Sequence, residues 1–451
     1  MAWMRLVRDH RFGSWSSAFA WQVGGVATLY LLVQAVVLSL APAGWQKFFV
    51  LKGEGGFQYW DAIHYFHLAE SPGCSAFFPL WPLLVRAVSG GNLASHGLVI
   101  QIVLSEVIFL FSLPLVLALF RKVIGEPKIS FLMLLLYALG PNSIFYSIGY
   151  TESLFSLCAC FLILCFSWVL AHGVIWKRIV LLIALVTLSF FLNLIRPALV
   201  QTVVASSFCA FFVLLPSPGS ADVFRRLRVV APPLSAILVG AALGYGSFGM
   251  YCLKVAGSIW EPFNQQVSWG RTLAFRPWLF VTPRSLLIDL HGLYAPALLL
   301  FVVALVAAMY LRGREKAVLS VPRNPAFLVT LIHPLFAILS NGFAQHRSGV
   351  RYWSHVLDVS SAWSKVANPV FLYCLAFSGV HSAINLAANS GYLYSTSRHF
   401  FASPFAFVAI GVVLAALSWS YIQKLLIGVW GVGMLLLAVQ WFNWAGNRWV
   451  G

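Results

Sequence analysis

The chain has 451 residues, of which 61% are hydrophobic and only 9% are charged. Apolar runs of about twenty residues recur along its length, so the composition excludes a soluble globular protein. Lys and Arg exceed Asp and Glu by 17, but the basic residues form short clusters between apolar runs. That pattern is typical of topology-setting charge and argues against nucleic acid as a partner. We expect an all-α integral membrane protein built as a multi-pass helical bundle.

The hydropathy pattern predicts about twelve transmembrane helices. The first follows a basic N-terminal segment without a convincing cleavage site, so we expect it to remain as a helix. No internal repeat or linker interrupts the series, which predicts a single domain over residues 1–451. The predicted spans are residues 21–42, 97–120, 129–148, 153–171, 179–195, 198–215, 229–253, 286–311, 326–344, 366–386, 404–421 and 425–441.

Basic clusters predict the orientation of the spans. Arginines near the N-terminus place it in the cytosol, and the clusters at residues 121–122, 177–178, 225–228 and 312–316 then fall on the same side. The opposite, luminal or extracellular side receives a large first loop and three further connections. These are residues 43–96, 149–152, 196–197 and 254–284. Simple alternation puts Arg398 in the cytosol, whereas a re-entrant apolar run would move it to the luminal side.

Seven cysteines lie mostly inside apolar runs and show no metal-type spacing. We interpret all of them as small packing residues. They are Cys74, Cys158, Cys160, Cys165, Cys209, Cys252 and Cys374.

The first loop holds the strongest candidate for catalysis. Only 12 of the 451 residues are acidic, and in a membrane protein a charge that no interface requires is a functional candidate. We expect residues 62–70, which end at Glu70, to form an amphipathic helix with Asp61 at its start and with Trp60, His64 and His67 on one face. Asp61 is either a helix N-cap or a catalytic carboxylate, and the sequence weights the two equally. A metal site is disfavoured because the two histidines lack a convincing third ligand.

Three blocks in the first third of the chain carry a family resemblance. They read WDAIHYFHLAE from Trp60, AFFPLWPLLVR from Ala76 and PNSIFYSIGYTESLF from Pro141. In order and spacing they resemble the family of the second mannosyltransferase of glycosylphosphatidylinositol (GPI) anchor synthesis and its bacterial relatives. Weaker blocks lie around Glu261 and Arg398. This chain has Trp-Glu-Pro where the family has Gly-Asp-Pro, which keeps the acid but lengthens it.

The resemblance implies a glycosyltransferase of the GT-C fold, with residues 43–96 as the catalytic luminal loop. It implies dolichyl phosphate mannose as donor, no cofactor, and a GPI-anchor precursor that receives a second, α-1,6-linked mannose with inversion. The resemblance also implies a location in the endoplasmic reticulum membrane and allows for an accessory membrane subunit. A bacterial relative would instead lie in the cytoplasmic membrane, with a polyprenyl phosphate carrier and another acceptor.

The residues fit such a mechanism. Displacing a phosphate from an anomeric carbon requires a base, for which Asp61 is the best candidate, with Glu152 as a second carboxylate. Guanidinium groups match phosphate oxygens, so Arg196, Arg271 and Arg398 are candidates for the donor phosphate. Further substrate-binding candidates are Trp60, His64, Glu70, Phe78, Glu261 and Gln266. The rival hypotheses are a lipid or sugar transporter, for which the number of spans with intramembrane Glu106 and His172 would argue, and a non-catalytic scaffold.

Overall fold

The structure is a computed structural model. It describes residues 17–41, 44–48, 60–91, 93–171, 173–214, 223–268, 270–274, 368–388, 395–401, 403–416, 422–446, 448 and 450. Within these ranges every regular element is a helix, which confirms the all-α prediction. The N-terminal arginines, His172, the predicted spans 286–311 and 326–344 and the basic cluster 312–316 lie outside the described residues.

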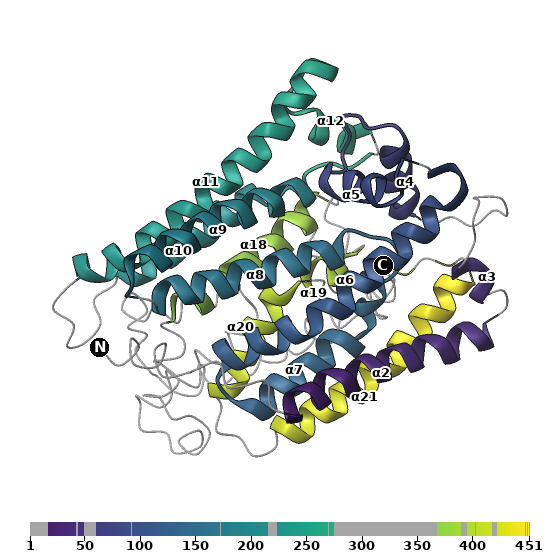
Figure 1. The fold of residues 1–451 in the computed structure, drawn as a ribbon, viewed down its shortest axis with the longest axis horizontal. Helices are drawn as coiled ribbons and strands as arrows, with labels where there is room; N and C mark the ends of the chain where they lie inside the picture. Colours follow the sequence, from purple (N-terminus) through teal and green to yellow (C-terminus); the bar gives the residue numbers. More distant parts are fainter. Residues whose placement is uncertain are drawn as a thin grey trace, which may run out of the picture.

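Long helices packed side by side form the body of the molecule (Figure 1). In the described part, six helices are long and apolar enough to cross a membrane, so the multi-pass prediction is confirmed. The predicted number of twelve transmembrane helices is not confirmed. The six are α2 (Ser17–Leu40), α6 (Leu93–Ile124), α8 (Glu152–Ala171), α9 (Ile175–Ile195), α11 (Val223–Ala256) and α21 (Ile422–Ala445). Four further helices, largely apolar, complete the body: α7 (Pro127–Leu139), α10 (Leu199–Leu214), α18 (Pro369–Ala388) and α20 (Pro404–Ala416).

One predicted span is wrong as a continuous helix. Residues 129–148 divide into α7 and the 3-10 helix η1 (Pro141–Tyr146). The cause is Pro141, which disfavours helical backbone in the residue before it, and Gly140 is accordingly extended with ψ 162°. The chain can therefore turn before it reaches the residues that precede α8.

Short helices gather at one end of the bundle. Figure 1 shows α4 (Asp61–Glu70), α5 (Leu80–Val88) and α12 (Glu261–Ser268) together at one end of the bundle, beside the end of α11. The predicted amphipathic helix is thus confirmed as α4, one residue longer than expected. Two other short helices are α3 (Gly44–Phe48) and α19 (Thr396–Phe401).

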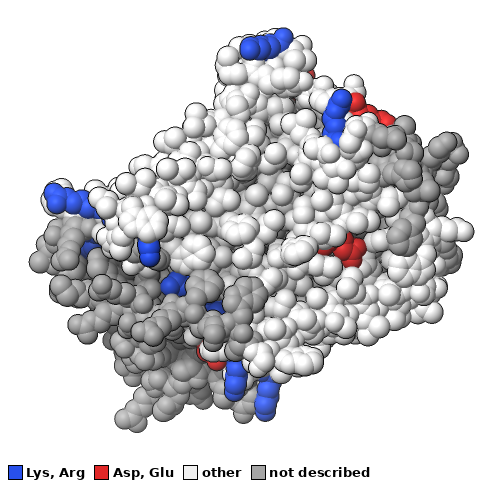
Figure 2. All heavy atoms as spheres, in the orientation of Figure 1, with Lys and Arg blue, Asp and Glu red and all other residues white. Residues whose placement is uncertain are grey.

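Charge is sparse on the face shown in Figure 2. Its Lys and Arg side chains lie mainly near the edges, and a broad uncharged surface separates them. Several large apolar side chains of the long helices are exposed, among them Trp21, Phe111 and Ile175. Such surface suits contact with lipid rather than water.

Two glycines allow α11 to approach α9 closely. Gly240 and Gly244 lie one helical turn apart on α11. A Cβ on Gly240 would come within 2.2 Å of the carbonyl oxygen of Val186, and one on Gly244 within 2.4 Å of that of Phe190. Small residues at this spacing permit the close backbone packing typical of membrane helices.

Replacing Gly240 with Ala is expected to destabilise the protein by roughly 1–3 kcal/mol, since the backbone of α9 must move to admit the methyl group. The measurement is the thermal unfolding midpoint of the purified protein in detergent. Gly246→Ala is the matched control on the same helix, because nothing lies within 4 Å of a Cβ there. Equal midpoints for both variants would contradict the close approach of the two helices.

Candidate functional site

An arginine from the C-terminal third joins two carboxylates from the N-terminal third. Arg398 of α19 donates from Nη1 to Oδ2 of Asp61 at 2.7 Å, and from Nε to Oε1 of Glu152. Asp61 is the first residue of α4 and keeps 28% of its side chain exposed, whereas the Glu152 side chain is fully buried. The pair therefore consists of one carboxylate with access from outside and one that is enclosed.

A second arginine neutralises the enclosed carboxylate. Arg196, directly after the last residue of α9, places Nη2 2.5 Å from Oε1 of Glu152. Its Nε donates to the hydroxyl oxygen of Thr151 at 2.8 Å, and that oxygen lies 3.4 Å from the hydroxyl of Tyr65. Two guanidinium groups thus satisfy the buried charge of Glu152, which would otherwise be strongly destabilising.

The turn before α8 orients this carboxylate. Gly149 has φ +82°, and a Cβ there would lie 3.1 Å from Nε2 of Gln101. Its carbonyl oxygen accepts hydrogen bonds from Gln101 Nε2 at 2.6 Å and from the Trp81 indole at 3.1 Å. Its amide donates to the hydroxyl oxygen of Ser105 at 3.0 Å. The turn is therefore fixed by neighbouring helices before it delivers Glu152.

Aromatic rings support the guanidinium of Arg398. Its central carbon lies 4.4 Å from the ring centroid of Tyr150 and 5.1 Å from that of Phe145. Cation–π contacts in a desolvated setting stabilise such a charge. The arginine is thus held in place by two rings as well as by two carboxylates.

Neighbouring charges set the protonation states of Asp61 and Arg398, which lie in the short helices α4 and α19. Burial would raise the pKa of Asp61, but Arg398, with smaller contributions from Arg271 and Arg196, holds that pKa below its usual value. Burial would lower the pKa of Arg398, yet Glu152 and Asp61 raise it well above its usual range. The site therefore contains an ionised Asp61 beside permanently charged guanidinium groups.

A third arginine lies at the exposed rim. The Nη1 of Arg271, shortly after α12, donates to Oε1 of Gln266 at 2.7 Å. Its charge acts on Asp61 and on Arg398, so it is electrostatically part of the same cluster. Glu261, the first residue of α12, instead accepts a hydrogen bond from Gln265 of its own helix at 3.2 Å.

Other predicted site residues have structural contacts. Trp60 precedes α4 and packs partly buried against the core, with φ 49°. His64 is exposed and stacks on Phe77 at 5.2 Å. Glu70 is paired with His67 at 3.4 Å, at the C-terminal end of α4, nine residues after Asp61. Phe78 is buried against Phe248 with centroids 4.8 Å apart.

Sequence reasoning missed several residues of the cluster. Tyr150 and Thr151 lie in the block that begins at Pro141, but neither side chain is charged, so residue type alone does not indicate them. His399 follows Arg398, and burial together with Arg398 and Arg196 lowers its pKa well below the usual value. Its imidazole is therefore neutral at physiological pH.

Backbone strain accompanies the two elements that meet here. Among the described residues, the non-glycine positions with positive φ are Trp60 at 49° and Ser395 at 56°. The first directly precedes α4, which begins with Asp61, and the second directly precedes α19, which carries Arg398. Strain of this kind costs about 1–3 kcal/mol per residue and persists only where surrounding contacts enforce it.

Comparison with known proteins identifies the region that holds most of this cluster. Residues 37–252 match the family model described as Mannosyltransferase (PIG-V). Over this region the chain is similar to the PIG-V mannosyltransferase family, and we call residues 37–252 the PIG-V family region. A human GPI alpha-1,6-mannosyltransferase 2 is 34% identical over 158 residues, which cover 32% of this chain and 30% of the human protein. GPI mannosyltransferase 2 of Drosophila pseudoobscura pseudoobscura is 27% identical over 127 residues, covering 26% and 28% of the two chains.

A solved structure also aligns with the chain. The apo oligosaccharyltransferase of Archaeoglobus fulgidus is 14% identical, with a TM-score of 0.44, and the match covers 93% of this chain and 56% of that one. The chain matches less than a third of the length of its curated PIG-V family relatives.

The PIG-V family region includes Asp61, Glu152 and Arg196 but ends before Arg271 and Arg398. Arg398 nevertheless contacts both carboxylates, so it lies at their end of the bundle. Of the two placements left open for Arg398, the contact fits the one on the side of Asp61 and disagrees with simple alternation. Hydropathy could not reveal this, because α19 has only six residues.

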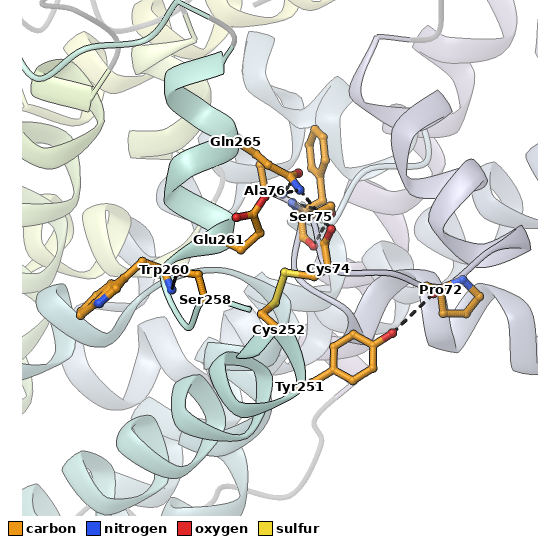
Figure 3. The surroundings of a disulfide bond; sticks show 11 residues. Pro72, Cys74, Ser75, Ala76, Tyr251, Cys252, Ser258, Trp260, Glu261 and Gln265 are labelled. Carbon is orange, nitrogen blue, oxygen red and sulfur yellow. Dashed lines mark hydrogen bonds between the residues drawn. A yellow bond between two sulfur atoms is a disulfide. The ribbon is translucent and has the colours of Figure 1, made fainter. Parts of the chain in front are cut away.

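The interpretation of all cysteines as packing residues is also wrong. Cys74, in the first loop, and Cys252, near the end of α11, form a disulfide with Cα atoms 5.2 Å apart (Figure 3). Both lie within the PIG-V family region. Cys252 stands in an apolar run, which hid its position at the helix end nearest the first loop.

Proposed function

We propose that the chain is a mannosyltransferase that moves mannose from dolichyl phosphate mannose to a GPI-anchor precursor. The observation that supports it most is the ion-paired cluster of Asp61, Glu152, Arg196 and Arg398 in a chain whose residues 37–252 match the PIG-V family model. The cluster supplies one accessible carboxylate and several phosphate-binding groups. These are the two requirements of glycosyl transfer from a lipid phosphate.

In the proposed reaction, the acceptor hydroxyl attacks the anomeric carbon of the donor mannose. The bond from that carbon to the phosphate oxygen breaks, and its electron pair stays on the phosphate. Asp61 takes the hydroxyl proton as general base. One displacement inverts the anomeric centre, so a β-linked donor gives an α-mannoside, and Glu152 acts by holding the arginines.

Arg398 has two roles in this scheme. Without substrate it is paired with Asp61 at 2.7 Å, and that pairing weakens the carboxylate as a base. A donor phosphate supplies a competing anion, and the guanidinium fork can bind phosphate oxygens while Nε remains on Glu152. Arrival of the donor thus releases Asp61 for catalysis, which ties base activation to donor binding.

The disulfide supports a site that faces an oxidising compartment. A disulfide forms and persists in an oxidising environment, and Cys74 lies in the same loop as Asp61. We therefore place the site on the luminal side of the endoplasmic reticulum membrane. The periplasmic side of a bacterial cytoplasmic membrane is the corresponding place for a polyprenyl-dependent relative.

The direct test uses the purified full chain with radiolabelled dolichyl phosphate mannose and a monomannosylated glucosaminyl-phosphatidylinositol. We expect a dimannosylated product whose new residue is removed by an α-1,6-specific mannosidase. A parallel arm with a shorter polyprenyl phosphate mannose distinguishes the bacterial alternative. Passage of the donor across sealed vesicles without any mannosylated product would contradict the proposal and favour the transporter.

A further inference from the structure

A disulfide ties the first loop to the end of a long helix. Cys74 belongs to residues 72–78, which we call the loop strap, and it is bonded to Cys252 of α11. Next to Cys252, the hydroxyl of Tyr251 donates to the carbonyl oxygen of Pro72 at 3.4 Å. Figure 3 shows both contacts on the same side of the strap.

A glutamine holds the same strap from α12. Gln265 donates from Nε2 to the carbonyl oxygen of Cys74 at 3.1 Å, and its Oε1 accepts from the amide of Ala76 at 3.0 Å. In Figure 3 the Gln265 side chain points from its helix onto the strap backbone beside the disulfide. The strap is thus fastened to α11 by a covalent bond and to α12 by two hydrogen bonds.

The strap also touches the helix that begins with Asp61. Phe77 stacks on His64 with ring centroids 5.2 Å apart, and it meets Tyr65 edge to face at 4.8 Å. On its other side, α12 leads to Arg271, whose side chain donates to Gln266 at 2.7 Å and whose amide donates to the carbonyl oxygen of Gln266 at 3.2 Å. The strap therefore stands between the helix of the proposed base and the helix that holds the rim arginine.

We propose that the Cys74–Cys252 disulfide is a positioning element, which holds the end of α11 and the adjoining α12 against the loop strap and so keeps Arg271 at the rim of the site. The inference rests on the mannosyltransferase function proposed above. The disulfide is the covalent tie between the strap and α11. The strap is also held by hydrogen bonds, by the ring contacts of Phe77 and by Phe78, which is buried against Phe248 of α11. Without the bond, the end of α11 and the α12 that follows it are held to the strap by non-covalent contacts alone, so α12 moves more freely and carries Arg271 with it.

The consequence for catalysis has a definite sign. Arg271 is one of the groups that lower the pKa of Asp61. Withdrawing this positive charge raises that pKa, so the proposed base is protonated at a higher pH. The acidic limb of kcat/KM, which reports the free enzyme, must then move to higher pH.

The experiment compares wild type, a Cys74→Ser/Cys252→Ser double variant, Arg271→Gln and the combination of all three changes. Each full-length protein is purified in detergent and assayed for mannose transfer across pH. We expect the double variant to lose about tenfold to 100-fold in kcat/KM, the range set by a misplaced binding group, and to shift the acidic limb upward. Because the disulfide acts through Arg271, adding the serine changes to Arg271→Gln should produce no further shift.

Two controls separate positioning from general damage. Gln265→Ala leaves the disulfide intact and removes the hydrogen bonds to the strap, so it should shift the limb in the same direction. Cys158→Ser changes a free cysteine outside the strap and should leave the profile unchanged. Hydrogen–deuterium exchange of residues 261–271 should rise in the double variant, and this readout requires no activity.

An unmoved acidic limb, or shifts that add in the combined variant, would overturn the proposal. So would unchanged exchange in residues 261–271. If wild type transfers no mannose, the proposed function fails, while the exchange measurement still decides whether the disulfide restrains α12.

Discussion

Replacing Asp61 with Asn is expected to lower mannose turnover by about 100-fold or more, since the variant keeps the size and hydrogen-bonding capacity of the side chain but not its basicity. The amide can still accept a hydrogen bond from Arg398, and Glu152 still compensates that charge. Structure should therefore survive while catalysis does not. The measurement is single-turnover transfer with saturating donor, alongside protein level and thermal midpoint.

The control for this change lies on the same helix. His67 is exposed on α4, and its side chain is paired with Glu70 rather than with the cluster. His67→Ala tests whether α4 tolerates substitution, and its turnover should stay near that of wild type. Wild-type turnover in Asp61→Asn would exclude Asp61 as the base and reduce it to an ion-pair partner.

The depressed pKa of Asp61 also predicts two different pH profiles. In the free enzyme Arg398 keeps Asp61 ionised, so kcat/KM should persist to a pH below the ordinary range of an Asp carboxyl. With donor bound, the phosphate competes for Arg398, and the acidic limb of kcat should lie at higher pH. The same pairing stabilises the fold above the unfolded-state pKa, and this stabilisation is lost as pH falls through the lower folded-state pKa. If the acidic limbs of kcat/KM and kcat lie at the same pH, Arg398 does not transfer from the Asp61 carboxylate to the donor phosphate.

Replacing Arg398 with Lys is expected to reduce turnover on the order of 100-fold, as loss of a preorganised charge-stabilising donor does. One ammonium cannot reproduce a planar group that reaches Asp61 from Nη1 and Glu152 from Nε while lying over Tyr150. The net charge of the chain is unchanged, so topology should not respond. The measurement is turnover and donor KM in reconstituted vesicles.

Arg178→Lys is the comparison for that experiment. Arg178 belongs to a basic cluster that sets topology, and its Nη2 donates to the carbonyl oxygen of Val229 at 3.1 Å, away from the carboxylates. Its turnover should match wild type. If both lysine variants are equally active, the bidentate role of Arg398 is wrong.

Part of the cluster could be predicted because charged residues are rare in this apolar chain. The topology prediction placed Asp61 in the first loop, and Glu152 and Arg196 at the ends of spans, all on the same luminal side. It did not show that their side chains meet. Hydropathy could not predict the position of Arg398, because a helix of six residues leaves no periodic pattern to count. Nor could it separate Ile129 to Ile148 into two elements, since the break depends on the backbone of Gly140 before Pro141.

Which side chains contact one another is decided by the fold, so the sequence did not predict the disulfide or the packing of Phe78. Cys74 and Cys252 are separated by 178 residues, and nothing local distinguishes Cys252 from the free cysteines in other apolar runs. Phe78 has the same aromatic character as a sugar-binding residue, yet its neighbours Phe248 and Tyr245 bury it as packing. Residue type predicted candidates, and only tertiary contacts could sort them.

The long sequence separation between Asp61 and Arg398 has a consequence for biosynthesis. The residues are 337 positions apart, which at ~5–20 residues/s corresponds to on the order of half a minute of translation. During that interval Asp61 and Glu152 lack their shared guanidinium, and only Arg196 is available to Glu152. A nascent chain stalled before α19 would therefore carry an incompletely neutralised acidic pocket, a distinguishing mark by which membrane quality control could recognise an unfinished molecule.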